Sequence, residues 1–255
     1  MARDHSSALA LLIDGDNASP KIISGLLGEI ANYGTAHVRR VYCDWTRPHL
    51  NAWKDCLLEY SIQPVQQFAY TTGKNATDGA MIIDAMDLLY TDRFSGFCNV
   101  SSDSDFARLA ARIREQGVTV YGFGERKTPR PFITACDKFV YFDVLAPVPP
   151  APDTGKRAVK SPPANPALDQ TTLDMLARAV TASADEDGRA NLARVGTHLA
   201  KQAPDFDARN YGFHRLSDLA EASGIVDIER AGEHQKMVIA RLRPRRSTPS
   251  TKKAK

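Results

Sequence analysis

Two carboxylates near the start of the chain follow a short apolar run. Residues 8–13 (ALALLI) carry no charge, and the polar turn Asp14–Asn17 (DGDN) comes directly after them. An uncharged run of this length that ends in a glycine-containing turn is typical of a strand buried on both faces of a parallel sheet. Because ligands bind outside the carboxyl ends of such strands, we take Asp14 as the centre of a site. The alternative is that Asp14 or Asp16 only caps the helix that begins near Ser19.

Three further carboxylates stand where predicted strands end or helices begin. Asp78 opens the apolar helical segment 78–89, and Asp103 and Asp105 follow the predicted strand 96–101. Carboxylates that converge in one pocket repel each other and raise each other's pKa values, unless a hard cation that prefers oxygen ligands compensates. The pattern therefore predicts Mg²⁺ or Mn²⁺ in this pocket, with phosphoryl transfer to water as the reaction. For Asp103, capping of the helix that follows is the alternative.

These carboxylates need a sheet to bring them together, and residues 1–145 have the pattern of one. The predicted strands are 8–13, 37–44, 64–68, 96–101, 118–123 and 139–142, and the predicted helices lie near 20–31, 50–58, 78–89, 106–116 and 129–136. Repeated strand–helix units of this length imply one doubly wound parallel sheet with right-handed crossovers. The acidic turns should then share one edge of the sheet. Helix 78–89 is so apolar that we expect it to be buried almost all round.

Proline content marks the end of this first domain. Residues 146–167 include seven prolines and should form a semi-extended linker. Helical period returns in three segments after residue 168, and two short strands, 225–228 and 237–240, follow them. Three helices and a terminal hairpin predict a winged-helix-like α+β domain over residues 168–243. Residues 244–255 are predicted to form a basic disordered tail.

Charge is unevenly divided among these regions. Residues 1–145 carry 15 Lys and Arg against 17 Asp and Glu, and residues 168–240 carry 8 against 12. Residues 241–255 carry 7 against none. A nonspecific attraction to polyanions is therefore expected of the tail and the linker, with a merely solubilising tail as the alternative.

Composition also excludes several classes of protein. No apolar run approaches the roughly 20 residues that span a membrane, and the N-terminus lacks a signal-peptide pattern, so we expect a cytoplasmic protein without membrane contact. The four cysteines and six histidines do not occur at zinc-ligand or redox spacings. We therefore expect no zinc site, and we expect the cysteines to pack as small hydrophobic residues.

Several motifs of residues 8–145 together resemble the NYN domain of the LabA-like group. They are Leu12–Asn17, Lys74–Asp78, Ile83–Asp87, Val100–Phe106, Gly122–Pro129 and Ala135–Asp137. NYN domains are similar to PIN-domain nucleases, so the resemblance implies a PIN-like fold in which an acidic cluster binds Mg²⁺ or Mn²⁺ and cleaves RNA. One departure is that Ser102 stands where many relatives have glycine, directly before the carboxylate of Asp103.

The resemblance implies roles for individual polar residues. The implied catalytic residues are Asp14, Asp78, Asp103 and Asp105, of which the first three are metal ligands. The implied supporting residues are Asp16, Asn17 and Ser101.

Basic residues in nearby loops complete the predicted site. The sheet topology should bring them towards the acidic edge, where they would hold RNA phosphates that the carboxylates would otherwise repel. These residues are Lys74, Arg126, Lys127 and Arg130.

A second resemblance covers the C-terminal domain. The motifs Leu192–Gly196, Pro204–Asp207, Tyr211–Phe213 and Leu216–Leu219 resemble the OST-HTH or LOTUS domain. Such domains are implied to bind RNA or a protein partner. Because residues 168–240 are acidic overall, RNA contacts are expected to be local, through Arg209, Tyr211, His214 and Arg215. For Tyr211, packing in the core is the alternative.

Three functions fit these residues. The first is a metal-dependent endoribonuclease in which metal-activated water hydrolyses the phosphodiester and the C-terminal domain binds RNA or a partner. The second is an RNA-binding or scaffolding protein whose acidic cluster is catalytically idle. The third is an aspartyl-phosphate phosphatase of the haloacid-dehalogenase type, suggested by Asp14-x-Asp16. The third is disfavoured because such enzymes need no carboxylate at a position like Asp78, and the complete acidic set favours the nuclease.

Overall fold

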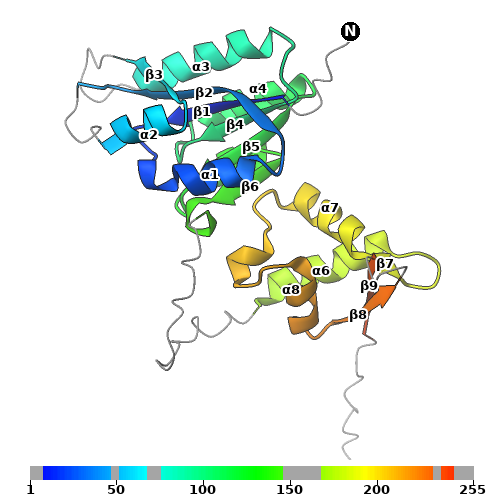
Figure 1. The fold of residues 1–255 in the computed structure, drawn as a ribbon. Helices are drawn as coiled ribbons and strands as arrows, with labels where there is room; N and C mark the ends of the chain where they lie inside the picture. The colour runs from blue at the N-terminus through cyan, green and yellow to red at the C-terminus, as the bar shows by residue number, and fades with distance from the viewer. Residues whose placement is uncertain (1–7, 47–51, 68–75, 146–167, 232–236, 244–255) are drawn as a thin grey trace, which may run out of the picture. The chain divides into compact units, whose positions relative to one another are not determined.

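The protein is built from two compact units (Figure 1). The computed structural model describes residues 8–46, 52–67, 76–145, 168–231 and 237–243. The first unit holds the elements from β1 to η3, and the second holds those from α6 to β9. The predicted linker 146–167 and the predicted tail 244–255 lie outside the described residues.

A six-stranded parallel sheet forms the centre of the first unit. Its strands run in the order β3-β2-β1-β4-β5-β6, and every neighbouring pair is parallel. The bounds are β1 Ala8–Asp14, β2 Thr35–Cys43, β3 Gln63–Gln66, β4 Gly96–Val100, β5 Thr119–Gly124 and β6 Lys138–Tyr141. The predicted doubly wound sheet is thereby confirmed.

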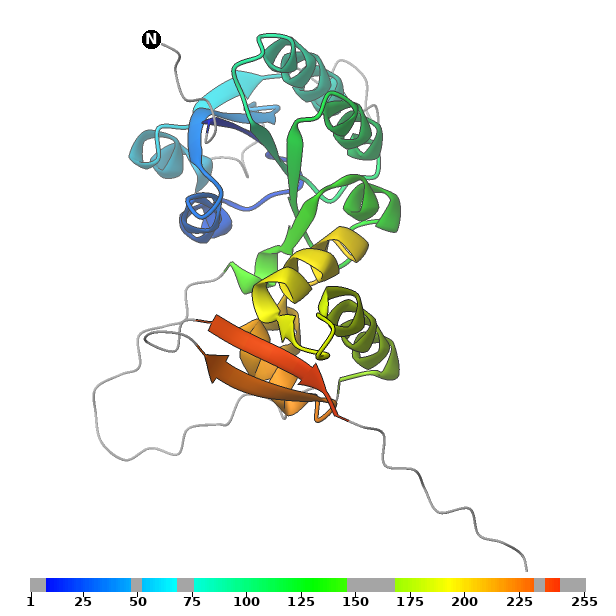
Figure 2. The same ribbon diagram turned by 90° about the vertical axis from the view of Figure 1, so that its right-hand side faces the viewer.

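Helices cover both faces of this sheet (Figure 2). Alternate side chains of β1 enter two separate cores, as the two-residue period of a strand requires. One core packs against α1 (Ile23–Ile30) and α2 (Trp53–Glu59), and the other packs against α3 (Ala76–Leu89), α4 (Phe106–Glu115) and α5 (Arg130–Ala135). Two 3₁₀ turns complete the unit, η1 (Pro20–Ile22) and η3 (Phe142–Val144).

The prediction that helix 78–89 is buried almost all round is wrong. α3 buries one stripe, Asp78, Met81, Ala85 and Leu89. Ile83 on another face is 62% exposed. The physical reason is the layer architecture, in which a helix that lies on one face of a sheet contacts it along one stripe only.

The second unit combines three helices with a small antiparallel sheet. Its elements are α6 (Gln170–Ser183), β7 (Ala190–Asn191), α7 (Leu192–Gln202), η4 (Ala208–Tyr211), α8 (Leu216–Ala222), β8 (Val226–Ala231) and β9 (Met237–Leu242). The strands lie in the order β7-β9-β8. The predicted α+β domain with three helices and a terminal hairpin is confirmed, and the two-residue β7 is an addition. Among the helices of the described segments, none has the length and hydrophobicity needed to cross a bilayer.

Two glycines of α1 offer a matched test of how this helix packs. A Cβ atom at Gly25 would collide with the backbone carbonyl oxygen of Leu145, whereas a Cβ atom at Gly28 would meet nothing within 4 Å. Gly25→Ala should therefore lower the free energy of unfolding by about 2 kcal/mol or more. Gly28→Ala should raise it by about 0.5–1 kcal/mol through helix propensity. Urea unfolding followed by circular dichroism measures both, and equal stabilities of the two variants would contradict the packing of α1 against Leu145.

Candidate active site

The carboxyl ends of β1 and β4 meet where the strand order of the sheet reverses. From β1 the chain proceeds outward through β2 and β3, whereas β4 leads to β5 and β6 on the other side. Such a switch point leaves a crevice outside the carboxyl ends of the two strands, which is the usual ligand site of an open α/β sheet. Asp14 is the last residue of β1, and Ser101–Asp105 follow β4 directly.

Asp14 is a buried carboxylate, with 1% of its surface exposed. Its Oδ1 accepts the backbone N–H of Asp16 at 3.1 Å. Its Oδ2 accepts the Asn17 side-chain amide at 2.7 Å and the Ser101 hydroxyl at 2.8 Å. Asp14 therefore organises its own turn and does not cap a helix, since the side chain of Ser19 caps η1. The capping alternative for Asp14 is wrong.

Ser101 connects the turns that follow β1 and β4. Its Oγ donates to Asp14 and accepts the backbone N–H of Asp103 at 3.1 Å. Its own N–H donates to the carbonyl of Phe123 at 3.0 Å. A Cβ atom at Gly124 would lie 2.6 Å from the Ser101 carbonyl oxygen, so a glycine lets the end of β5 approach this turn. Sequence reasoning missed Gly124, and its only signal was its place inside a matching motif.

Ser102 fits the same arrangement. Its Oγ accepts the backbone N–H of Glu125 at 2.8 Å, and its side chain is buried. Ser102 therefore attaches the turn after β4 to the end of β5.

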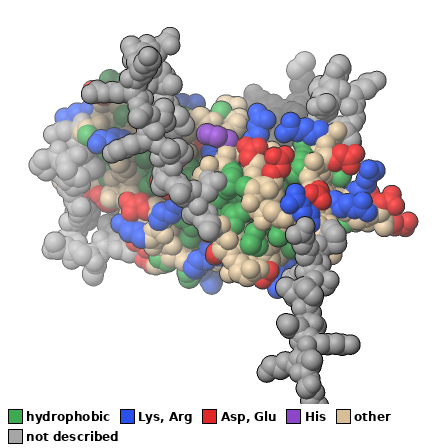
Figure 3. Space-filling view, turned by 90° about the horizontal axis from the view of Figure 1, so that it is seen from below, with side chains coloured by type: hydrophobic (Ala, Val, Ile, Leu, Met, Phe, Trp, Pro, Cys, Tyr) green, Lys and Arg blue, Asp and Glu red, His purple; other side chains and the backbone are tan. Residues whose placement is uncertain are grey.

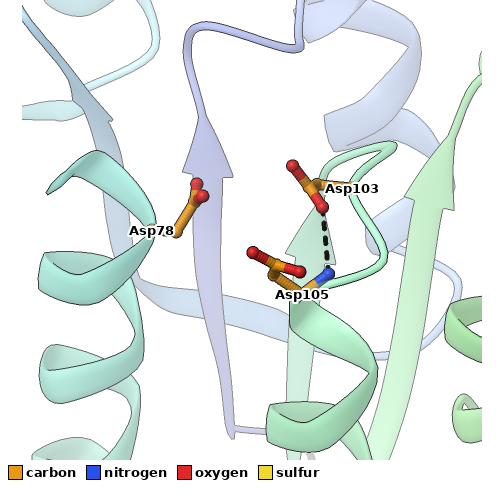
Figure 4. Close-up of side chains that lie close together, drawn as sticks. All are labelled: Asp78, Asp103 and Asp105. Atoms are coloured by element: carbon orange, nitrogen blue, oxygen red, sulfur yellow. Dashed lines mark hydrogen bonds between the residues drawn. The ribbon is translucent and has the colours of Figure 1, made fainter. Parts of the chain in front are cut away.

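Asp78, Asp103 and Asp105 form one group of carboxylates (Figure 4). One oxygen from each lies within 4.8 Å of the other two. Asp78 comes from the first turn of α3, and the other two come from the turn between β4 and α4. The Oδ1 of Asp103 accepts the backbone N–H of Asp105 at 3.0 Å, and Asp105 precedes α4 without a side-chain capping bond. Capping of α4 thus does not account for the position of either carboxylate.

Burial and nearby like charges raise the pKa values of Asp78 and Asp14. The pKa of Asp78 rises from 3.8 to about 6, first because the side chain is buried and then because Asp14, Asp103 and Asp105 lie near it. Burial also raises the pKa of Asp14, although hydrogen bonds from Ser101 and Asn17 oppose that rise. The site therefore concentrates negative charge, which a bound cation would relieve.

The donor set fits a hard divalent cation. The three grouped side chains offer carboxylate oxygens, which Mg²⁺ and Mn²⁺ prefer over nitrogen and sulfur. A carboxylate has about four lone-pair positions, and the hydrogen bonds of Asp14 use three of them. Asp14 thus lies beside the group with capacity for one further ligand contact. Asp16, also predicted to support the site, is exposed on the same turn.

Three of the four predicted basic residues form ion pairs. Lys74 is outside the described residues. The guanidinium of Arg126 donates to both carboxylate oxygens of Asp143, at 3.2 and 2.9 Å, and lies over the ring of Tyr141. Lys127 pairs with Glu125 at 2.9 Å. Arg130, at the start of α5, pairs with Asp205 at 2.8 Å, although 63% of its side chain is exposed. Their role in phosphate binding stays a prediction.

Of the predicted RNA-contacting residues of the second unit, two form side-chain hydrogen bonds and two are exposed. Arg209 donates two hydrogen bonds to Asp207, at 3.0 and 2.7 Å. The half-buried Tyr211 accepts a hydrogen bond from Thr172 at 3.2 Å. His214 and Arg215 are exposed just before α8.

A half-buried polar network that holds α3 was missed by sequence reasoning. Asp84 of α3 accepts hydrogen bonds from Arg40 and from the Tyr42 hydroxyl, both at 2.8 Å. Burial, followed by the hydrogen bond to Asp84 and then by its charge, raises the pKa of the Tyr42 hydroxyl. The network ties α3 to β2, and Asp78 lies on the same helix. Its signal was Asp84 within a matching motif and Arg40 within a predicted strand.

Sequence comparison finds a match to a domain family for each unit. The sequence profile of the NYN domain matches residues 8–145, and that of the OST-HTH/LOTUS domain matches residues 168–238. Comparison with curated proteins finds no match.

Two solved structures are similar to the chain. One is the crystal structure of a protein of unknown function from Vibrio parahaemolyticus, with 19% identity over 57% of this chain and 99% of that chain and a TM-score of 0.48. The other is the solution structure of an uncharacterized protein from Nitrosomonas europaea, with 27% identity over 38% of this chain and 94% of that chain and a TM-score of 0.30.

The raised pKa of Asp78 predicts a pH-dependent stability. Because the folded state binds this proton more tightly than the unfolded state, the contribution of Asp78 to the free energy of unfolding should fall as pH rises from 3.8 to about 6. Asp78→Asn removes the buried charge. Without divalent metal, the variant should be more stable than the wild type above this interval.

Urea unfolding in EDTA, at pH values below, within and above this interval, measures the effect. Asp87→Asn on the exposed side of α3 is the control for loss of one charge from the helix. Added Mn²⁺ should stabilise the wild type more than Asp78→Asn, because a cation that binds the folded state stabilises it. A variant with an unchanged pH profile would contradict the electrostatic coupling of the group.

Proposed function

Because this chain belongs to the NYN domain family, which is part of the PIN-like nuclease superfamily, we propose that it is a metal-dependent endoribonuclease. The observation that carries the proposal is the carboxylate group Asp78, Asp103 and Asp105 at the switch point of the sheet. The reaction is hydrolysis of an RNA phosphodiester.

Each acidic residue has a role that follows from its contacts. Asp78, Asp103 and Asp105 hold Mg²⁺ or Mn²⁺, and Asp14 adds a fourth carboxylate through its remaining lone pair. When bound, the cation lowers the pKa of a coordinated water and offsets the charge of the phosphodiester. Negative charge on all four acids is needed for this, so protons compete with the cation, and metal affinity should decrease as pH falls through about 6, where Asp78 of the metal-free site gains its proton.

The polar residues around Asp14 orient the carboxylates. Ser101 holds the turn that presents Asp103, and Asn17 neutralises part of the charge on Asp14 by donating its amide. These bonds restrain the carboxylate and the turn, so the ligand oxygens need little rearrangement when the cation and RNA bind.

The second unit supplies substrate affinity in this proposal. OST-HTH/LOTUS domains bind RNA, and residues 168–238 match that family. A binding domain joined to a catalytic domain by a linker raises the effective concentration of the substrate at the active site. The alternative is that this domain binds a protein partner.

Asp103→Asn tests the chemistry. The amide oxygen can still accept the N–H of Asp105, so the turn should keep its shape while one ligand charge is lost. RNA cleavage in Mn²⁺ or Mg²⁺ should fall by at least about 10- to 100-fold, because the loss of even an indirect metal contact has an effect of this size. RNA retention on a filter should equal that of the wild type. EDTA should abolish cleavage by the wild type.

Asp87→Asn is the matched control, since it removes one charge from an exposed position of the same domain. Equal cleavage by Asp103→Asn and the wild type would overturn the nuclease proposal. Retained RNA binding in that case would favour a protein with a catalytically idle acidic cluster.

Separation of the domains tests how the work is divided. Cutting the chain within residues 151–164 should leave an N-terminal fragment that cleaves RNA, since all four proposed ligands precede residue 146. The fragment should need more RNA for half-maximal rate and keep its rate at saturation, because only the effective concentration falls. Initial rates against RNA concentration measure both quantities, and a fragment with no cleavage at any concentration would contradict the proposed division.

A further inference from the structure

A hollow in the second unit lies between α6 and α7. Its volume is about 360 Å³. Its lining residues are Ala182 and Ser183 from the end of α6, with Ala193, Arg194, Thr197, His198 and Lys201 from α7. The small side chains of the lining leave the space open. The longer ones, Arg194, His198 and Lys201, are basic, and no lining residue is acidic.

The basic lining residues share one side of α7. Arg194, His198 and Lys201 recur at intervals of four and three, which brings side chains to the same face of a helix. The residues that anchor α7 in the core, Val195 and Leu199, lie on another face and are fully buried. The basic residues therefore do not hold the fold together, and α7 presents them as a row.

Other arginines of the same unit, unlike Arg194 of this row, form ion pairs with carboxylates among the described residues. Arg189 pairs with Glu229, Arg209 with Asp207, and Arg243 with Asp227. Figure 3 shows basic and acidic side chains next to one another on one face. Within the described parts of the chain, neither Arg194 nor Lys201 forms an ion pair. Both side chains keep an uncompensated positive charge beside the hollow.

The backbone dipoles of α6 and α7 do not by themselves set the sign of the electrostatic potential at the hollow. The first turn of α7 contributes partial positive charge, and the last turn of α6 contributes partial negative charge at Ala182 and Ser183. The two contributions oppose each other. Arg194 and Lys201 therefore decide that the hollow attracts anions.

We propose that this face of α7, Arg194, His198 and Lys201 with the adjoining hollow, binds backbone phosphates of RNA. That the polymer is RNA rests on the proposed function, whereas the attraction of phosphate follows from the charges. The hollow is at the lower end of the size of small-molecule sites, about 300 Å³ and more, so it suits a phosphate and its ribose. The electrostatic contact of this unit then lies on α7, and Arg209, which Asp207 already neutralises, contributes little.

The test measures RNA binding by the full chain in EDTA, where cleavage is absent. Arg194→Ala with Lys201→Ala should lower the affinity for a fluorescent RNA oligonucleotide by about 10-fold or more at low salt. The slope of log affinity against log salt should fall by about 1.4, which corresponds to two lost phosphate contacts on a single strand. Both residues are exposed, so circular dichroism should show an unchanged fold.

Two control variants make the result specific. Arg189→Ala with Arg243→Ala removes the same charge from positions that carboxylates already neutralise, and should change affinity and slope little. Arg194→Lys with Lys201→Arg keeps both charges and should keep the wild-type slope. An unchanged slope in the alanine pair, or an equal loss in the paired-arginine control, would overturn the proposal.

Competitors identify the ligand independently of the nuclease proposal. Unlabelled RNA should displace the probe, and DNA of the same sequence should displace it less well, because RNA carries the 2′-hydroxyl. Equal displacement by DNA would overturn the assignment to RNA. Since cleavage plays no part in this assay, failure of Asp103→Asn to reduce cleavage would leave the binding result unaffected.

Discussion

Burial of the Asp14 carboxylate is the constraint on which the site depends. A buried carboxylate is costly unless donors surround it, and Asp14 receives hydrogen bonds from Asp16, Asn17 and Ser101. Because Ser101 also accepts the N–H of Asp103, the bonds that make the buried charge tolerable set the turn of the next carboxylate. The ends of two neighbouring strands thus become one rigid edge.

The repulsion within the acidic group requires a second support. Asp78 lies close enough to the other acids for their charges to raise its pKa. A larger distance between Asp78 and these acids would lower the electrostatic energy. The Asp84 contacts with Arg40 and Tyr42 hold α3 against β2 about 9 Å further along the helix. Retained repulsion of this kind weakens the fold without metal and increases its affinity for a cation.

The two units have complementary charges in our interpretation. The crevice of the first unit gathers carboxylates, and the hollow of the second has basic side chains around it. A polyanion that the acidic crevice repels in the absence of metal needs an attraction elsewhere. The α7 face would provide it on a separate domain, so catalytic residues and affinity residues can change independently.

The sequence by itself determined the elements and the candidate chemistry, because both rest on local patterns. Apolar period predicted the strands and helices of both domains, and the carboxylates at strand ends indicated a cation site. The apolar period gave a wrong prediction for the burial of helix 78–89, because it does not show how many other elements pack against a helix. Only the tertiary structure decided which charges are compensated. Arg126 and Arg209 looked available and are paired, whereas Arg194 and Lys201 are not. Packing sets such distances between side chains, and the order of residues along the chain does not contain them.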